Sequence, residues 1–200
     1  KRCALFNNGA FGQVGAGEDV SADVRRRQIE VNVMGAHDLT CRVLPAMRAN
    51  GEGRIVQCSS VLGLVSGIYR GGYCASKFAL EALSDALRLE LRDTGIRVSL
   101  IEPGPIRTRF VETALANVKK AVDIDASPHR DAYLARLAAM EAGGSSTFKL
   151  EPEAVAAKLV HAVESARPKA RYYVTTPTYI AAGLRRVLPT ALLDRVLLRM

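Results

Sequence analysis

The chain has 200 residues, 48% of them hydrophobic and 24% charged, and its net charge is +8. This length and composition are ordinary for one globular domain with a core of its own. The four cysteines form no CxxC pair and no cluster with histidine, which argues against a zinc site and a disulfide framework. No signal peptide and no apolar run of membrane-spanning length are visible. We therefore expect reduced thiols, no bound metal and a cytoplasmic protein.

The positive charge is spread along the chain, with basic residues at 25–27, 119–120 and 185–186 among other places. Few aromatic residues alternate with them, so solvated helix faces are a better interpretation than a nucleic-acid patch. We expect no nucleic-acid partner. Anionic cofactor phosphates or lipid headgroups are alternatives that could use part of the charge.

The first quarter of the chain predicts a strand, a glycine-rich loop and a long helix. The apolar run Cys3–Asn8 is typical of a buried strand, and glycines punctuate residues 9–17. Helical spacing begins at Ser21, a suitable N-cap, and continues to Gly51, a suitable stop. The residues expected along one face of this helix are Val24, Gln28, Val31, Gly35, Leu39 and Val43.

The same alternation continues after Gly51. A strand rich in Ile and Val is expected at Gly53–Ser60, followed by a glycine-punctuated loop at 61–72. A long amphipathic helix then runs from Tyr73 to Gly95. The strand Ile96–Glu102 comes next, and Pro103 stops it.

The second half of the chain is less regular over 109–150. Pro152 suits the first turn of a helix, and Pro189 divides the apolar and basic tail into two short pieces. The elements expected here are a helical stretch at 130–144, a helix at 151–166, a strand at 170–176 and a helical tail at 178–200.

Strands that alternate with long helices predict an α/β fold, a Rossmann-like doubly wound parallel sheet with helices on both faces. Ligands of such sheets bind beyond the carboxyl ends of the strands. Polar pairs follow the three apolar strands at Asn7–Asn8, Ser59–Ser60 and Pro103–Gly104. We expect these pairs along one rim, although ordinary turn chemistry explains each of them alone.

Tyr73 and Lys77 are four residues apart on the long helix, so they share one face. A cation beside a phenol lowers the pKa of the phenol and makes it useful as a general acid or base. The alternative is an ordinary Tyr/Lys pair on a half-exposed helix. Tyr133 has no lysine four positions on and is interpreted as a packing residue.

Five short motifs follow one another along the chain. They are NNGA at Asn7–Ala10, VN at Val31–Asn32, SSVLG from Ser59, YCASK at Tyr73–Lys77 and PGPIRT at Pro103–Thr108. In type, order and spacing, these motifs resemble the short-chain dehydrogenase/reductase family over nearly the whole chain. The first βαβ unit of that family, with its glycine-rich dinucleotide turn, has no counterpart before Cys3. We therefore expect a fragment of a longer protein, N-terminally truncated.

The resemblance implies an oxidoreductase that moves a hydride between NAD or NADP and a carbonyl or secondary alcohol. It assigns the acid/base role to Tyr73, with Lys77 favouring phenolate and reaching the nicotinamide ribose. Ser60 holds the substrate oxygen, with Ser59 as a rival for that role. Asn32 holds a water that links Lys77 to solvent, or it simply bridges its helix to neighbouring backbone.

The resemblance also places the cofactor against two loops. Asn8 and Gly9 approach the adenine-side ribose, although the order of Gly and Ala is exchanged relative to the family. Pro103, Gly104 and Ile106 shape the loop over the nicotinamide. The remaining contact is Thr108, which is suited to the carboxamide; Tyr73 and Lys77 complete the cofactor contacts.

We expect a single incomplete dinucleotide-binding and catalytic domain over 1–200, with a substrate lid at 109–150. Because the lid is apolar, the expected partner is an apolar carbonyl or alcohol, unless these side chains only pack the lid. The tail at 178–200 could contact a membrane surface or pack on the body. The family implies a homo-oligomer. The alternative function is a non-catalytic dinucleotide-sensing or membrane-associated scaffold.

Overall fold

The computed structural model describes residues 3–142 and 147–199. Within them, four parallel strands form one sheet in the order β1-β2-β3-β4. Strands that are neighbours in space are thus neighbours in sequence, and helices connect them. The strands are β1 (Ala4–Asn7), β2 (Gly53–Cys58), β3 (Ile96–Glu102) and β4 (Arg171–Tyr173).

Helices occupy most of the remaining described residues. The first half contains α1 (Ala22–Ile29), a π-helical segment (Glu30–Gly35), α2 (Ala36–Ala49), a 3₁₀ turn (Val61–Gly63) and α3 (Gly71–Glu90). The second half contains α4 (Phe110–Ala121), α5 (Arg130–Glu141), α6 (Glu153–Glu164), α7 (Thr176–Val187) and α8 (Thr190–Leu197).

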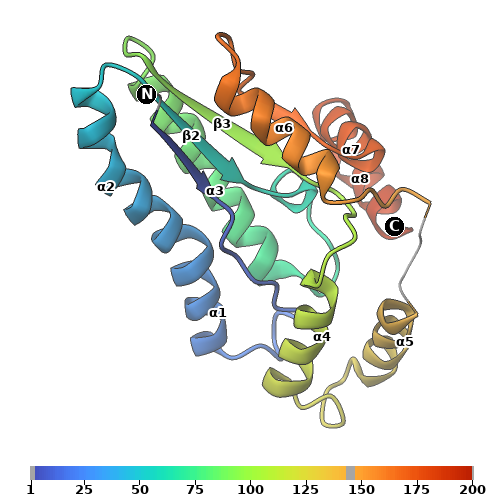
Figure 1. Ribbon diagram of the computed structural model, residues 1–200. Helices are drawn as coiled ribbons and strands as arrows, with labels where there is room; N and C mark the ends of the chain where they lie inside the picture. The colour runs from blue at the N-terminus through green and yellow to red at the C-terminus, as the bar shows by residue number, and fades with distance from the viewer. Residues whose placement is uncertain (1–2, 143–146, 200) are drawn as a thin grey trace.

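The sheet is covered on both faces, which confirms the predicted doubly wound architecture (Figure 1). Successive β2 residues point to opposite sides, as the strand period of two requires. Ile55 packs with Met47 of α2 and Leu87 of α3 in one core cluster. Val56 packs with Ala162 of α6 in the cluster on the other face. The strand is buried almost throughout because both of its faces are covered.

The stripe predicted for the helix at 21–50 is wrong in its middle, from Val31 to Leu39, whereas Val43 near the end packs against a core cluster as predicted. Val31 is 42% exposed and Leu39 is 52% exposed, whereas Asn32 and Thr40 are buried. The π-helical segment is the physical reason, because its wider turns rotate the later part of the helix relative to a 3.6-residue repeat. The residues that face inward are therefore displaced from the predicted stripe.

A second core forms away from the sheet, where the glycine-rich loop meets α4 and α5. It includes Val14, Val118 and Tyr133, all buried. The expectation of irregular structure after residue 109 missed α4, whose apolar positions gain their meaning only against this loop. The helical stretch expected at 130–144 is confirmed as α5, and its last two residues, 143–144, lie outside the described residues.

The tail forms two helices separated at Pro189, as the sequence indicated. Both lie beside α6 at the β4 end of the sheet (Figure 1). Residue 200 of the predicted tail is outside the described part of the chain. Among the residues with described structure, no helix combines the length and the apolar character that crossing a membrane requires.

Candidate active site

The carboxyl ends of β1, β2 and β3 lie side by side, as predicted for the polar pairs that follow these strands. Asn7 is level with Gln57, and Cys58 is level with Ile101. Beyond the strands, the backbone N–H of Val61 donates to the carbonyl of Pro103 at 2.8 Å. This bond joins the loop after Ser60 to the loop after β3, so both loops belong to one rim.

Tyr73 lies in the first turn of α3, at this rim, and is 8% exposed. Its ring and the ring of Phe110 at the start of α4 have centroids 5.5 Å apart. Phe110 also lies against the backbone of Gly12, where an added Cβ would meet the ring at 2.7 Å. These three elements enclose a small cavity of about 40 Å³, which has room for little more than a few water molecules.

The wall of the cavity is mainly apolar and comes from the loop at 12–14, α4 and α5. Besides Tyr73, two polar side chains interrupt it, those of Gln13 and Arg70. The sequence motifs gave no signal for either residue. The apolar residues of the wall are Val14, Phe110, Val111, Ala114 and Met140.

Burial raises the pKa of Tyr73 above its ordinary value, and the nearby Ser60 hydroxyl works in the opposite direction. The expected lowering by Lys77 is not what this arrangement produces. The Lys77 ammonium lies 5.7 Å from the centre of the Tyr73 ring and donates to the carbonyl of Cys58 at 2.7 Å. The phenol and the ammonium do lie near one another, but desolvation of the phenol dominates.

Lys77 is a desolvated cation, 2% exposed. Burial lowers its pKa, while the charges of Cys58 and Glu81 favour the ammonium. No carboxylate of the described residues lies within ion-pair distance of it. Of its three N–H donors, the structure assigns one to Cys58, so two can serve a bound ligand.

The two neighbouring serines point to different places. Ser60 precedes the 3₁₀ turn, accepts from the N–H of Leu62 at 3.1 Å, and acts on Tyr73. Ser59 is buried on the side of Gly63 and Glu81, and it lowers the pKa of Glu81. The local geometry thus favours Ser60 over Ser59 as the serine that serves the tyrosine.

Asn32 lies in the π-helical segment and is 1% exposed. Its amide accepts from the N–H of Phe11 and donates to the carbonyl of Phe11, both at 3.0 Å. It also donates to the Ser76 hydroxyl at 3.0 Å. These bonds match the bridging alternative stated above, because they connect the helix to the glycine-rich loop and to α3. π-Helical segments often occur at functional sites.

The residues assigned to the cofactor lie on the same rim. Asn8 and Gly9 are exposed directly after β1, and a Cβ added to Gly9 would meet nothing within 4 Å. Gly104 lacks such space, because a Cβ there would collide with the Thr175 hydroxyl at 2.0 Å. Thr108 is exposed, and its hydroxyl accepts from the N–H of Phe110 at 3.3 Å.

The loop after β3 is held in place at two positions. Ile106 forms an isolated parallel bridge with Leu150. Next to this bridge, the N–H of Leu150 donates to the carbonyl of Pro105 at 3.2 Å. The proposed nicotinamide loop is therefore fixed to the segment that follows α5.

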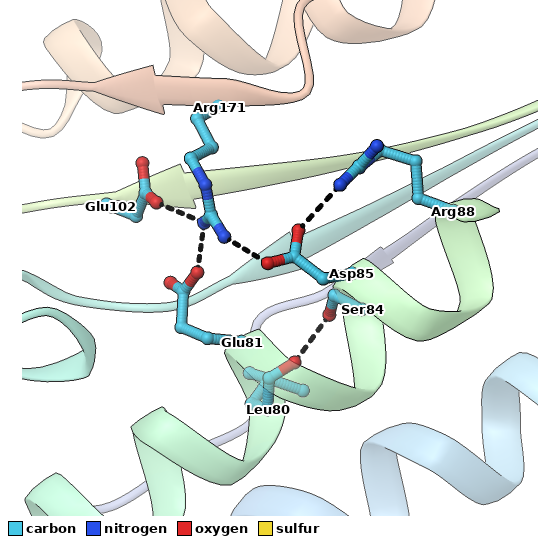
Figure 2. A network of polar contacts seen from close by, with 7 residues as sticks. All are labelled: Leu80, Glu81, Ser84, Asp85, Arg88, Glu102 and Arg171. Atoms are coloured by element: carbon cyan, nitrogen blue, oxygen red, sulfur yellow. Dashed lines mark hydrogen bonds and ion pairs between the residues drawn. The ribbon is translucent and has the colours of Figure 1, made fainter.

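A buried ionic cluster lies one turn beyond Lys77, and no motif in the sequence pointed to it (Figure 2). Arg171 of β4 reaches between α3 and the end of β3 and contacts Glu81, Glu102 at 2.8 Å and Asp85 at 2.5 Å. Glu102 is completely buried. Burial and the charge of Glu81 raise the pKa of Glu102 to about 8, so the cluster keeps a proton near neutral pH.

A second polar cluster joins the glycine-rich loop to α5. The Tyr133 hydroxyl donates to the Asp19 carboxylate at 2.9 Å and accepts from the N–H of Ala16 at 2.5 Å. A hydrogen bond from Ser127 is the largest influence that lowers the pKa of Asp19. The interpretation of Tyr133 as mere packing was incomplete, and the missing partner is 114 residues away in the sequence.

Comparison with protein families gives one clear match. A family model described as short chain dehydrogenase matches residues 3–119. An uncharacterized oxidoreductase of Escherichia coli, YbbO, is 48% identical over 96% of this chain and 66% of its own length. An NADPH-dependent 3-dehydrocapnine reductase of Ornithobacterium rhinotracheale is 33% identical over 96% of this chain and 68% of its length. This chain thus spans about two thirds of those relatives.

Solved structures give the same picture. A short-chain dehydrogenase from Streptomyces avermitilis superposes with a TM-score of 0.74 and 27% identity, over 97% of this chain and 66% of that chain. A short chain dehydrogenase from Burkholderia cenocepacia in complex with NADP superposes with a TM-score of 0.70 and 21% identity. The match covers 96% of this chain and 70% of that chain. At that identity, the second likeness shows the fold alone.

Proposed function

This chain belongs to the short-chain dehydrogenase family, and from that premise we propose that it forms the proton-transfer part of an oxidoreductase site. The reaction is reversible hydride transfer between NAD or NADP and a carbonyl or secondary alcohol. One observation carries the proposal: Tyr73 lines a cavity at the strand ends, with Ser60 beside it and Lys77 one turn along α3. A bound nicotinamide supplies or accepts the hydride.

Tyr73 handles the proton. In the reductive direction, its hydroxyl gives a proton to the carbonyl oxygen as that oxygen becomes an alcohol. Burial keeps the phenol protonated, which suits this acid role. In the oxidative direction the phenol must first ionise, and the Ser60 hydroxyl and the positive end of α3 both favour that form.

Ser60 and Lys77 set the geometry around Tyr73. Ser60 holds the substrate oxygen within reach of the phenol, which converts a chance encounter into an oriented one. Lys77 offers its two remaining N–H donors to the ribose next to the nicotinamide. Asn32 acts at one remove, because it fixes the backbone of Phe11 and hence the loop that closes the cavity.

The residues on the rim fit a dinucleotide. Asn8 and Gly9 have open space around them and hold the adenine-side ribose. Pro103, Gly104 and Ile106 present the loop backbone to the nicotinamide. The hydroxyl of the exposed Thr108 faces the carboxamide in this assignment. These contacts do not decide between NAD and NADP.

The segment at 109–150 acts as a lid over the substrate in this proposal. Support comes from the apolar side chains of the cavity wall, which belong mainly to α4 and α5. The volume of about 40 Å³ requires Phe110 and its helix to move before a substrate can enter. The described part of the tail, residues 178–199, belongs to the same single domain in this proposal and lies beside α6 (Figure 1).

Assembly into a homo-oligomer is also proposed. The support is that α2 and α3 leave large apolar side chains in contact with solvent. Leu39 is 52% exposed and Leu89 is 59% exposed. Light scattering coupled to gel filtration of the full-length protein gives the test. A monomer at micromolar concentration contradicts the proposal.

The decisive experiment follows the oxidation of NADH or NADPH by absorbance, in the full-length protein, with a panel of aldehydes and ketones. We expect turnover in the wild type and a loss of about 10²- to 10⁴-fold in kcat/KM for Tyr73→Phe, since one positioned acid/base is removed. Tyr133→Phe serves as a control, because that phenol lies outside the cavity wall. Full turnover in Tyr73→Phe overturns the assigned mechanism.

A further inference from the structure

Arg70 is a cation in the wall of the cavity that holds Tyr73. It is the residue immediately before α3, and its carbonyl accepts from the N–H of Cys74 at 2.8 Å. This backbone bond places the side chain at the entrance to the helix, three residues from the phenol. Arg70 is half-buried as a residue, and burial lowers the pKa of its guanidinium.

The charge of Arg70 is not neutralised within the described part of the chain. No carboxylate there lies within 4.0 Å of its guanidinium. The other groups that act on it are Arg136, Cys74 and Tyr73, and Arg136 is a second cation. Partial burial without a charged partner costs free energy, and an anion that enters the cavity beside Arg70 offsets that cost.

The immediate surroundings strengthen the preference for an anion. Arg136 on α5 donates to the carbonyl of Ile68 at 3.3 Å, which holds its charge near the residues before Arg70. The N-terminus of α3, a helix of 20 residues, adds the positive end of its dipole. Gln13 contributes no negative charge, and its amide already donates to the carbonyl of Val14 at 2.9 Å.

We propose that the cavity binds a substrate with an apolar chain and an anionic group, such as a carboxylate, and that Arg70 pairs with this group. The apolar residues of the wall cover the chain of the substrate. Arg guanidinium and carboxylate form two parallel hydrogen bonds, which fix orientation as well as adding affinity. The inference rests on the proposed function, since Tyr73 acts on the same molecule. The sequence suggested an apolar substrate, and this inference adds an anionic group to it.

A binding experiment tests the anion site without any need for turnover. Calorimetry of the full-length protein compares octanoate with octanamide, which has nearly the same shape and no charge. We expect octanoate to bind at least about tenfold tighter, as hydrogen bonds to charged groups imply. In Arg70→Gln that ratio falls to about one, and in Arg70→Lys, which keeps the charge, part of it remains.

Arg109→Gln is the matched control. Arg109 comes directly before α4, as Arg70 comes directly before α3. Its side chain, however, is 94% exposed and lies 3.8 Å from Glu112. We expect this variant to keep the wild-type ratio. Equal binding of octanoate and octanamide by the wild type overturns the proposal. A ratio that survives Arg70→Gln but disappears in Arg136→Gln overturns the assignment to Arg70.

Kinetics separate this inference from the proposed function. The pair is 8-oxooctanoate and its methyl ester, each followed by oxidation of NADPH or NADH. We expect a preference for the acid of at least about tenfold in kcat/KM, lost in Arg70→Gln. Turnover with no preference for the acid overturns the anion site and leaves the oxidoreductase proposal standing. Discrimination between octanoate and octanamide with no turnover of either aldehyde supports the anion site and counts against that proposal.

Discussion

Two consecutive turns of α3 lie beside cations whose surroundings are opposite. At the first, Lys77 is almost fully buried and donates to a backbone carbonyl, with no carboxylate of the described residues at ion-pair distance. At the second, Glu81 and Asp85 face Arg171, which also contacts Glu102 (Figure 2). One cation is left with spare donors, whereas the other has more carboxylates than its single charge can neutralise.

The difference separates a binding site from a structural joint. A desolvated ammonium with unused donors costs stability and is retained for what it can bind. An arginine between three carboxylates connects α3, β3 and β4. Removing one member of a buried ion pair leaves the other charge without a partner, which lowers stability. In α3, the turn of the candidate site therefore carries a buried charge without an ion-pair partner, and the turn that follows is tied to β4 by ion pairs.

Replacing each of the two cations with methionine tests the difference between them most directly. We expect Arg171→Met to lower the free energy of unfolding by about 3–5 kcal/mol, because it leaves carboxylates buried without a partner. We expect Lys77→Met to leave stability equal or higher, while kcat/KM falls by at least about 10²-fold. Urea unfolding at pH 8 and the nicotinamide assay measure the two effects on the full-length protein.

Arg88→Met controls for the loss of any arginine near this cluster. Among the described residues, Arg88 pairs with Asp85 alone, and its side chain is 38% exposed, so we expect a cost below about 1 kcal/mol. If Arg171→Met proves as stable as Arg88→Met, the cluster is not the joint described here. If Lys77→Met unfolds like Arg171→Met, the contrast between the two cations is wrong.

The proton held by the cluster makes stability depend on pH. Burial and the charge of Glu81 raise the pKa of Glu102 from its ordinary 4.5 to about 8, while Arg171 opposes the rise. The folded protein therefore retains a proton that the unfolded chain has released above pH 4.5. The associated stability is complete below about pH 4.5 and is lost as the pH rises through about 8.

Glu102→Gln keeps the shape of the protonated side chain and removes its titration. We expect the wild type to lose stability more steeply than the variant between pH 4.5 and 8, by up to about 1.4 kcal/mol per pH unit. Urea unfolding at a series of pH values provides the two curves. Parallel curves over that window show that Glu102 does not hold the proton.

Ser59 and Ser60 test the same difference with two adjacent residues, since Ser60 lies near Tyr73 and Ser59 lies near Glu81. We expect Ser60→Ala to lower kcat/KM by about 10- to 100-fold, because the substrate oxygen loses its hydrogen bond. We expect Ser59→Ala to change stability by less than about 1 kcal/mol and to keep the wild-type kcat/KM, because the buried Ser59 hydroxyl has no hydrogen-bond partner among the described residues and faces Gly63 rather than the cavity. Each variant is the control for the other in the assay and in urea unfolding. Exchanged effects show that the roles are reversed.

Much of the architecture was predictable because the signals are local. β3 runs from Ile96 to Glu102 as predicted, since an apolar run of strand formers ends at Pro103. The alternation of strands and helices predicted the parallel sheet, and the carboxyl ends of its strands gave the rim. The position of Tyr73 relative to Lys77 follows from helical periodicity alone.

The helix at 21–50 shows where local signals fail. A period of 3.6 residues places Val31 and Leu39 on the inner face, but the π-helical segment turns them outward. That segment places Asn32 against the loop at Phe11, a contact across 21 residues that no pattern in the helix announces. The helix α4 was missed for a related reason, because the loop that buries its apolar face comes about 100 residues earlier.

Spacing and periodicity act over a few residues, so the amino-acid sequence was enough to predict the fold class, the order of the elements and the serine, tyrosine and lysine of the candidate site. Only the tertiary structure decided which charges meet. Arg171 finds Glu81 across 90 residues, and Arg70 finds no carboxylate among the described residues at all. Coulomb interactions and desolvation depend on distance in space. For that reason the raised pKa of Tyr73 and the candidate anion site emerged only once the chain was folded.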